Sequence, residues 1–217
     1  MSDPDTAAAA VLAQLPGWRV AADAAFGRRL VSGGAVPRRR SYAMTRDLAA
    51  DPPPHGWATP DAPHGIRLTP ADRPAAALVR AFGAAFPADH PDFAAMAPPE
   101  NPERELAALL ARDLLPCSGL AVQEDAVVGA ILGNAQSGAP PLGGPWITDL
   151  FRDPHVPGTG TPLLRRALAM GAADGLPALG LAVSPGNPAE RLYAAHGFTA
   201  VLDALRAELP GTHEGPA

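Results

Sequence analysis

Apolar residues recur every three or four positions in three stretches of the chain, a spacing that is typical of amphipathic helices. The first helix is expected to run from Thr69 as N-cap, with Pro70 at its first position, to about Phe86. A second is expected to begin at Asn101 and to end near Leu115. The apolar positions of the third, followed by a glycine that stops it, are Leu163, Leu164, Ala167, Leu168, Gly171 and Gly175.

Short runs of β-prone residues between turns predict six strands and one further helix. The strands are Ile66–Leu68, Ser118–Gln123, Ala126–Gly133, Trp146–Phe151, Ala178–Ser184 and Phe198–Leu209, and the helix is Ala189–His196. The resulting order is β-α-α-β-β-β-α-β-α-β. A mostly antiparallel sheet with one parallel crossover indicates an α+β (mixed α/β) fold rather than a doubly wound one.

Prolines divide the chain into parts. Residues 51–64 hold five prolines in fourteen positions, which predicts a linker or an extended surface strap. The main domain is expected over residues 65–209, with a disordered tail at 210–217. Residues 1–50 form an N-terminal arm rich in alanine and arginine.

The arm repeats the end of the main domain faintly. An ungapped alignment sets Leu30 on Tyr193 and Gly34 on Gly197, and a strand-like stretch follows in both places. Two interpretations stay open: the arm is the remnant of a second, degenerate half lying against the main sheet, or it is a loose Ala/Pro segment. Because Leu30 stands where Tyr193 does, only one active site is expected in either case.

Charge and composition exclude several classes of protein. All 17 basic residues are arginines, so a Walker phosphate loop and a lysine Schiff base are excluded. The net charge of −5 gives no basic field for nucleic acid, and the cluster Arg38–Arg40 is interpreted as a solvated face. A single cysteine, Cys117, fits a reducing compartment. With no apolar run long enough to span a bilayer and no positively charged N-terminal region, a cytoplasmic protein without a membrane partner is expected.

A glycine-rich turn, Gly158-Thr159-Gly160, opens the third predicted helix. Free N–H groups and the dipole at a helix N-terminus form an anion site, and glycines let a phosphate approach the backbone. A dinucleotide fingerprint is excluded because Leu163 stands where its third glycine belongs.

Two motifs flank this turn and the last predicted helix. The first is Leu150-Phe151-Arg152-Asp153-Pro154 followed by His155-Val156-Pro157-Gly158-Thr159-Gly160, and the second is the stretch GNPAERLYAAHGF, which contains Asn187, Tyr193 and Gly197-Phe198. In this order and about thirty residues apart, they resemble the signature of the GNAT superfamily of acyl-CoA-dependent N-acetyltransferases. The resemblance covers roughly residues 65–209.

The resemblance implies an acetyl-CoA site, a sheet splayed at the coenzyme and roles for single residues. Backbone N–H groups of the turn would bind the pyrophosphate, the strand end would pair with the pantetheine arm, and Asn187 would contact that arm. The N–H near Leu150 would polarise the thioester carbonyl, and Tyr193 would protonate the departing thiolate. The implied coenzyme-binding residues are Leu150, Phe151, His155, Val156, Gly158, Thr159, Gly160, Thr161, Asn187 and Tyr193.

Two positions depart from the family pattern. His155 stands where Gln or Arg is usual, which puts side-chain help to the phosphates in doubt, and Pro157 removes one N–H donor. The turn still leaves the N–H groups of Val156, Gly158, Thr159, Gly160 and Thr161 to bind the coenzyme.

The acceptor amine must lose a proton, so a general base is expected near the strand end. Asp149 is the nearest carboxylate in sequence, and its alternative role is an outward-facing strand residue. Asp89, His90 and Asp92 could bind or deprotonate the amine, or could be turn residues only. Tyr193 could likewise be a packed helix tyrosine. The remaining histidines show no metal-ligand spacing, so no metal is expected.

The leading hypothesis is an N-acetyltransferase that moves an acetyl group from acetyl-CoA to a primary amine by direct attack in a ternary complex. The favoured acceptor is a small or amino-acid-like molecule, and a peptide N-terminus and a protein lysine stay open as alternatives. The resemblance implies a homodimer as a possible assembly. Two alternatives stay open: a non-catalytic acyl-CoA-binding or regulatory domain with the same fold, and a pure interaction module.

Overall fold

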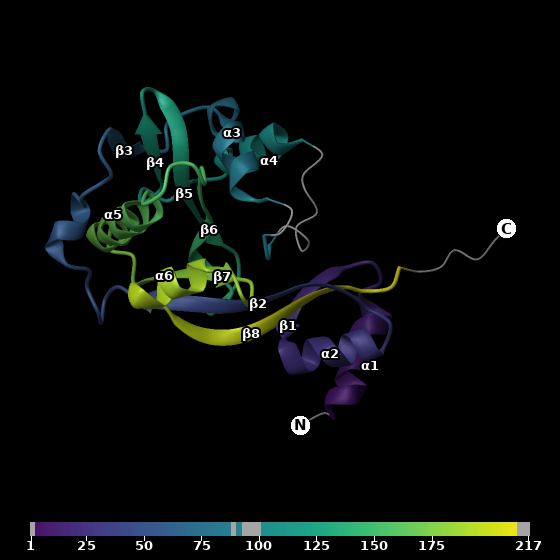
Figure 1. Ribbon diagram of the computed structural model, residues 1–217. Coiled ribbons are helices and arrows are strands. Elements are labelled where there is room, and N and C mark those ends of the chain that lie inside the picture. The colour runs from purple at the N-terminus through teal and green to yellow at the C-terminus, as the bar shows by residue number, and fades with distance from the viewer. Residues whose placement is uncertain (1–2, 88–89, 93–100, 212–217) are drawn as a thin grey trace.

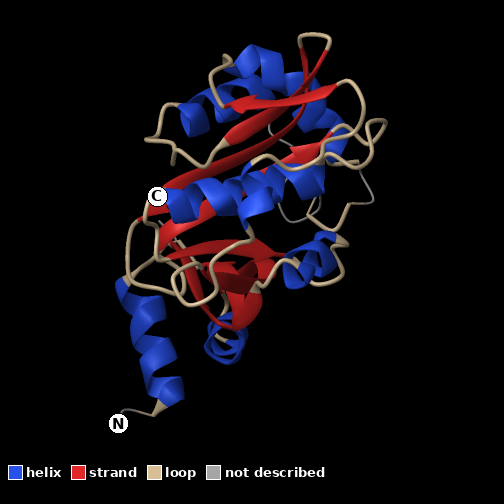
Figure 2. Cartoon of the chain, turned by 90° about the vertical axis from the view of Figure 1, so that its left-hand side faces the viewer, coloured by secondary structure: helices blue, strands red, loops and turns tan. Residues whose placement is uncertain are grey.

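The computed structural model describes residues 3–87, 90–92 and 101–211. Eight strands form one twisted sheet with helices on both faces (Figures 1 and 2). The elements are α1 (Pro4–Gln14), β1 (Arg19–Asp23), α2 (Ala24–Ser32), β2 (Val36–Asp47), a 3₁₀ turn η1 (His55–Ala58), β3 (Ile66–Pro70), α3 (Ala75–Ala85), α4 (Pro102–Leu110), β4 (Gly119–Gln123), β5 (Ala126–Gln136), β6 (Gly144–Arg152), α5 (Gly160–Ala173), β7 (Ala178–Val183), α6 (Ala189–Ala195) and β8 (Thr199–Glu208).

From β3 to β8 the element order is the predicted one, and the predicted α+β fold is confirmed. The strands lie in the order β1-β8-β2-β7-β6-β5-β4-β3. Every neighbouring pair is antiparallel except β6 and β7, which run parallel and are paired only at Trp146–Gly180 and Ile147–Leu181. Beyond Ile147 the two strands separate, so the sheet opens near its middle.

Residues 19–47 lie within the sheet and are not a loose arm. Strand β2 is inserted between β7 and β8, and β1 pairs with the outer edge of β8 (Figure 1). Helix α2 begins at its cap Asp23 and packs on β8, where Leu30 and Ala35 are buried with Ala207. The main sheet therefore depends on strands from both ends of the described chain.

The first long helix starts later than the sequence indicates. Thr69 and Pro70 belong to β3, because they pair with Leu120 and Gly119 of β4, and α3 begins only at Ala75 after Pro74. Asn101 is confirmed as an N-cap, since its Oδ1 accepts the Arg104 N–H at 3.0 Å. Helix α4 ends at Leu110 rather than near Leu115.

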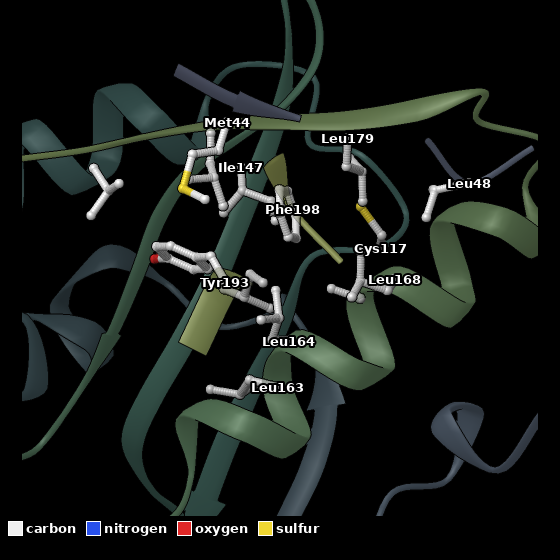
Figure 3. Close-up of a cluster of buried hydrophobic side chains, with 14 of the residues drawn as sticks. Met44, Leu48, Cys117, Ile147, Leu163, Leu164, Leu168, Leu179, Tyr193 and Phe198 are labelled. Carbon is white, nitrogen blue, oxygen red and sulfur yellow. The ribbon is translucent and has the colours of Figure 1, made fainter. Parts of the chain in front are cut away.

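The core forms two layers, one on each face of the sheet. Under α5 and α6, buried side chains include Leu164, Leu168 and Phe198, and Figure 3 shows the Tyr193 ring packed beside them. On the opposite face, Leu78 and Leu106 of α3 and α4 pack on β4 and β5. These two layers hold the opening between β6 and β7 in place.

The proline-rich stretch 51–64 packs on α5 through Trp57. The guanidinium carbons of Arg46 and Arg165 lie 5.1 and 5.5 Å from the Trp57 ring centre. Arg165 Nε–H donates to His196 Nε2 at 3.2 Å, so the His196 proton is on Nδ1, which donates to the Leu192 carbonyl at 2.8 Å. This cluster ties the segment to β2, α5 and α6.

No helix in the described part of the chain has both the length and the apolar character needed to cross a bilayer.

Candidate active site at the opening between β6 and β7

A bulge in β6 sets the direction of Asp149. Leu132 of β5 pairs with Asp149, but the next residue, Gly133, pairs with Ile147, so Thr148 is an extra residue in the ladder. In a regular strand, residues an odd number of positions apart point to opposite faces. Because of the bulge, Trp146 and Phe151 both point to the face covered by α3 and α4. Asp149 is turned to the same face instead of the core under α5.

Beyond Ile147, β6 has lost its partner β7, so its backbone on that side is open. A cavity of about 420 Å³, here called the α5 cavity, follows this open edge. It extends along β6 from Ile147 to Arg152 and reaches Gly160, the first residue of α5. Leu150 and Phe151, two of the residues that the resemblance assigns to the coenzyme, line it.

The turn before α5 leaves several N–H groups free. Gly158 has φ of +85°, which favours glycine, and Thr159 is fully buried. Among the described residues, no acceptor takes the N–H groups of the four residues Gly158, Thr159, Gly160 and Thr161. Of the four, Gly160 lines the end of the α5 cavity, and the other three are its neighbours in the chain. With the helix dipole, this end of the cavity is suited to phosphate.

The backbone N–H groups of His155 and Val156, two residues predicted to bind the coenzyme, already have acceptors within the protein. Buried Asp153 accepts the His155 N–H at its Oδ1 (2.9 Å) and the Val156 N–H at its carbonyl oxygen (3.0 Å). The expectation that the Val156 N–H is free is therefore wrong. His155 does not line the cavity, whereas Arg152 does, and its guanidinium donates to the carbonyl oxygens of Asp153 and Pro154 at 3.2 and 3.3 Å. Arg152 lies in the first of the two motifs but was not predicted to bind the coenzyme.

Tyr193 projects from α6 into the α5 cavity. Its ring packs edge-on against Phe198 with centres 5.8 Å apart, and its hydroxyl points out of the cluster (Figure 3). Burial first, and then the charges of Asp92 and Asp149, raise the pKa of Tyr193. The hydroxyl therefore keeps its proton at neutral pH and can donate it.

Asp149 is half-buried and lines the same cavity. Burial raises its pKa to about 6; Glu105 and Asp92 also raise it, while Arg39 and Arg112 lower it. A carboxylate with a pKa slightly below neutral is ionised at pH 7 and can still accept a proton effectively.

Asp92 is the centre of a buried polar cluster. It forms an ion pair with Arg39 of β2 (2.9 Å) and accepts hydrogen bonds from the Ser184 hydroxyl and from Asn187 Nδ2 (2.8 Å). His90 Nδ1 lies 4.0 Å from the same carboxylate. The structure thus brings His90 and Asp92 to the site, while Asp89 lies outside the described residues.

Asn187 is held by the protein itself. Its Oδ1 accepts the Ala189 N–H at 2.8 Å at the start of α6, and its amide nitrogen is bound to Asp92. The side chain lines the α5 cavity, but both of its polar atoms already have partners.

The interpretation of Arg38–Arg40 as a solvated face is wrong for Arg39. Arg38 and Arg40 bind Glu208 (2.7 Å) and Asp203 (2.6 Å) on the surface, whereas Arg39 points into the site and donates to Ser184 at 3.0 Å. Strand alternation predicts that the middle arginine points opposite to its neighbours. The missing information was that this strand joins the sheet beside β7.

A second cavity of about 570 Å³, here called the α4 cavity, lies on the α3/α4 side of the sheet. Arg39, Thr148, Asp149 and Ala182 line both cavities, so the two meet at the opening of the sheet. A molecule in one cavity can therefore reach a molecule in the other beside Asp149.

Within residues 3–87, 90–92 and 101–211, no group of three or more His, Cys, Asp or Glu side chains is placed to hold a metal ion.

No protein-family profile and no curated protein sequence matches the chain. Solved structures do. A GCN5-related N-acetyltransferase from Sphaerobacter thermophilus superposes with a TM-score of 0.61 at 25% identity, over 89% of this chain and 60% of that one. A GCN5-related N-acetyltransferase from Kribbella flavida gives 0.54 at 16% identity, over 98% and 78% of the two chains.

A tandem GNAT protein from the clavulanic acid biosynthesis pathway gives a TM-score of 0.53 at 16% identity, over 88% of this chain and 58% of that one. The present chain thus spans less than two thirds of the Sphaerobacter and tandem proteins. The predicted resemblance is confirmed at the level of architecture: the chain has the fold of the GCN5-related N-acetyltransferase (GNAT) superfamily.

Proposed function

We propose that the protein is an N-acetyltransferase that moves an acetyl group from acetyl-CoA to the primary amine of a small or amino-acid-like acceptor, by direct attack in a ternary complex. One observation carries the proposal. The α5 cavity, with a phosphate-type helix N-terminus at its end, meets the α4 cavity at Asp149 and Thr148. Two substrates, one in each cavity, can meet there.

The residues around the α5 cavity fit coenzyme A. The free N–H groups of Gly158, Gly160 and Thr161, with the Arg152 guanidinium nearby, suit a pyrophosphate. The open edge of β6 offers unpaired backbone groups to an extended arm, as an edge strand does to a peptide. When bound, acetyl-CoA supplies the activated acetyl thioester.

Asp149 is suited to remove the proton of the acceptor amine. As the amine nitrogen forms its bond to the acetyl carbon, the carbon–sulfur bond breaks and its electron pair goes to sulfur. The amine proton goes to Asp149, whose pKa of about 6 leaves it ionised at neutral pH.

Tyr193 is suited to protonate the departing thiolate. Its pKa is raised by burial, so the hydroxyl carries its proton at neutral pH and can share it with a thiolate that forms within hydrogen-bond distance. After the transfer, proton exchange with water restores Tyr193 and Asp149.

Calorimetric titration with acetyl-CoA, followed by a free-thiol assay over a panel of amines, tests the proposal. Saturable binding and amine-dependent thiol release are expected. The absence of a binding signal at millimolar acetyl-CoA would overturn the proposal.

The packing of Tyr193 against Phe198 favours one second candidate, a non-catalytic acyl-CoA-binding domain in which this ring is only structural. Tyr193→Phe separates the two. As a proton donor, Tyr193 should contribute about 10²-fold or more to kcat, with acetyl-CoA binding unchanged. The matched control is Tyr42→Phe, because Tyr42 is the only other tyrosine and lines neither cavity. Equal activity of both variants would assign Tyr193 to packing.

The cytoplasm is the proposed location, since Cys117, the sole cysteine, cannot form a disulfide within the chain.

A further inference from the structure

The α4 cavity carries an unequal set of charges. Its floor is the sheet, where small residues such as Ala21, Ala43 and Ala204 leave room, and α4 forms one wall. Three guanidinium groups line it, against two carboxylates, those of Glu105 and Asp149. The carboxylate of Asp92, which pairs with Arg39 from outside the cavity lining, makes the numbers equal, so the positions of the charges decide what the cavity can bind.

Of the three arginines, only Arg39 forms an ion pair within the described residues, and Arg206 differs from Arg112 in that no carboxylate charge acts on it. Arg39 is neutralised by Asp92 at 2.9 Å, and the charge of Arg112 acts on Asp149. Arg206 of β8 faces Arg39 across the ladder, and no carboxylate of the described residues lies within 4.0 Å of it. Burial and the Arg39 charge lower the pKa of Arg206, although its side chain is still exposed. An anion beside Arg206 would relieve this repulsion.

The strand order separates the two ends of the cavity. Asp149 is on β6 and Arg206 is on β8, with β7 and β2 between them. Three strand spacings correspond to roughly 14 Å between backbones, which the long arginine side chain shortens. The carboxylates thus lie at one end of the cavity, and the unneutralised guanidinium lies at the other.

We propose that the acceptor is an amine that carries an anionic group, a carboxylate or a phosphate, at its far end, and that Arg206 binds this group while Asp149 receives the amine. The inference rests on the proposed function and names the class of its acceptor. A guanidinium matches both oxyanions through paired N–H donors.

A series of ω-amino acids, from glycine to 6-aminohexanoate, tests the class when each acid is compared with its own amide in the thiol-release assay. Aminoalkyl phosphates of matched length distinguish the two oxyanions. The best anionic amine should exceed its amide about tenfold or more in kcat/KM, as a charged hydrogen bond implies. Arg206→Gln should remove most of this preference while leaving the KM for acetyl-CoA unchanged.

Arg73→Gln is the matched control, because Arg73 is exposed and lies outside both cavities. If amides react as well as acids, or if the preference survives in Arg206→Gln, the inference is wrong. Calorimetric binding of the same amines gives a readout that does not depend on turnover. If anionic amines bind through Arg206 but no acetyl group is transferred, the proposed function fails while the ligand class stands. If acetyl transfer occurs without any anion preference, only the ligand class fails.

Discussion

Asp149 faces the site because one extra residue, Thr148, interrupts the ladder of β6. The bulge has a chemical consequence as well as a geometric one. Burial on this face raises the pKa of Asp149 to about 6, and the neighbouring arginines keep it from rising further. The pKa is therefore set by burial and by neighbouring charges that come from different parts of the chain.

If Asp149 is the base, kcat/KM should rise with pH through about pH 6 and level off above it, because the carboxylate must be ionised. Asp149→Asn should remove this limb and lower kcat by about 10²- to 10⁴-fold. The control is Asp125→Asn, which makes the same change of charge at the exposed tip of the β4–β5 hairpin. A pH–rate profile that is unchanged in Asp149→Asn would exclude Asp149 as the base.

Asp149→Asn should not lower stability, although it should lower activity. A raised carboxyl pKa means that the folded protein holds this proton more tightly than the unfolded chain, so ionisation opposes folding as the pH rises towards about 6 and above. The amide that Asp149→Asn introduces carries no charge to bury. The variant should therefore melt no lower than the wild type at pH about 8, while it loses activity.

Single residues were predictable where a short motif surrounds them. The turn at Gly158 and Gly160 and the position of Tyr193 followed from local patterns, and the structure places the turn and the tyrosine at one cavity. Arg39 and Arg206 were not predictable, because they reach the site only through the pairing of β2 with β8. No local signal in the chain indicates that pairing.

At the scale of elements, consecutive arginines of β2 have different roles because their side chains point to opposite faces of the strand. Arg38 and Arg40 lie on the solvent side and pair with exposed carboxylates of β8, while Arg39 is 16% exposed and holds Asp92. Exposed pairs contribute little to stability, whereas removing one member of a buried pair leaves the other charge without compensation.

Arg39→Gln should therefore lower the free energy of unfolding by about 2–4 kcal/mol, measured by urea denaturation. Arg38→Gln and Arg40→Gln, one position to either side, should each cost less than about 1 kcal/mol. Since Asp92 also binds Asn187 and Ser184, loss of Arg39 should disturb the α5 cavity as well, which Asp92 and Asn187 line. Equal costs for all three variants would contradict the inward role of Arg39.

Elements were predictable wherever local chemistry decided them. The Asn101 cap and the β4–β5 hairpin, with positive φ at Glu124 and Asp125, followed from residue preferences. The start of α3 did not, because pairing with β4 extends β3 through Pro70 and overrides the capping signal at Thr69. For β2, the sequence predicted a strand-like stretch and left open that it lies against the main sheet. Its place between β7 and β8 was not predicted, because its β7 partners lie more than 130 residues away.

At the scale of the whole molecule, the N-terminal segment is a structural part of the site. Strand β2 has β7 on one side and β8 on the other, and α2 covers β8 from one face (Figure 1). Removing this segment would separate β8 from the rest of the sheet and take Arg39 from the site.

Trypsin provides the test at this scale. The peptide bonds after Arg38, Arg39 and Arg40 lie within a paired strand, so their cleavage should occur only through global unfolding and should accelerate with urea accordingly. The bond after Arg112, in the turn that follows α4, is the control that should be cut under native conditions. Early release of the first 40 residues with an unchanged melting temperature would contradict this picture.

The position of β2 also has a consequence for the order of assembly during synthesis. A ribosome makes Val36–Asp47 early, yet the strands on either side of it, β7 and β8, are among the last to emerge. Until then, β2 has no partner and its edges are open, a condition that invites wrong pairing. Because Arg39 reaches Asp92 only when β2 is seated, the site forms at the end of folding, and an incomplete chain has no competent acceptor side.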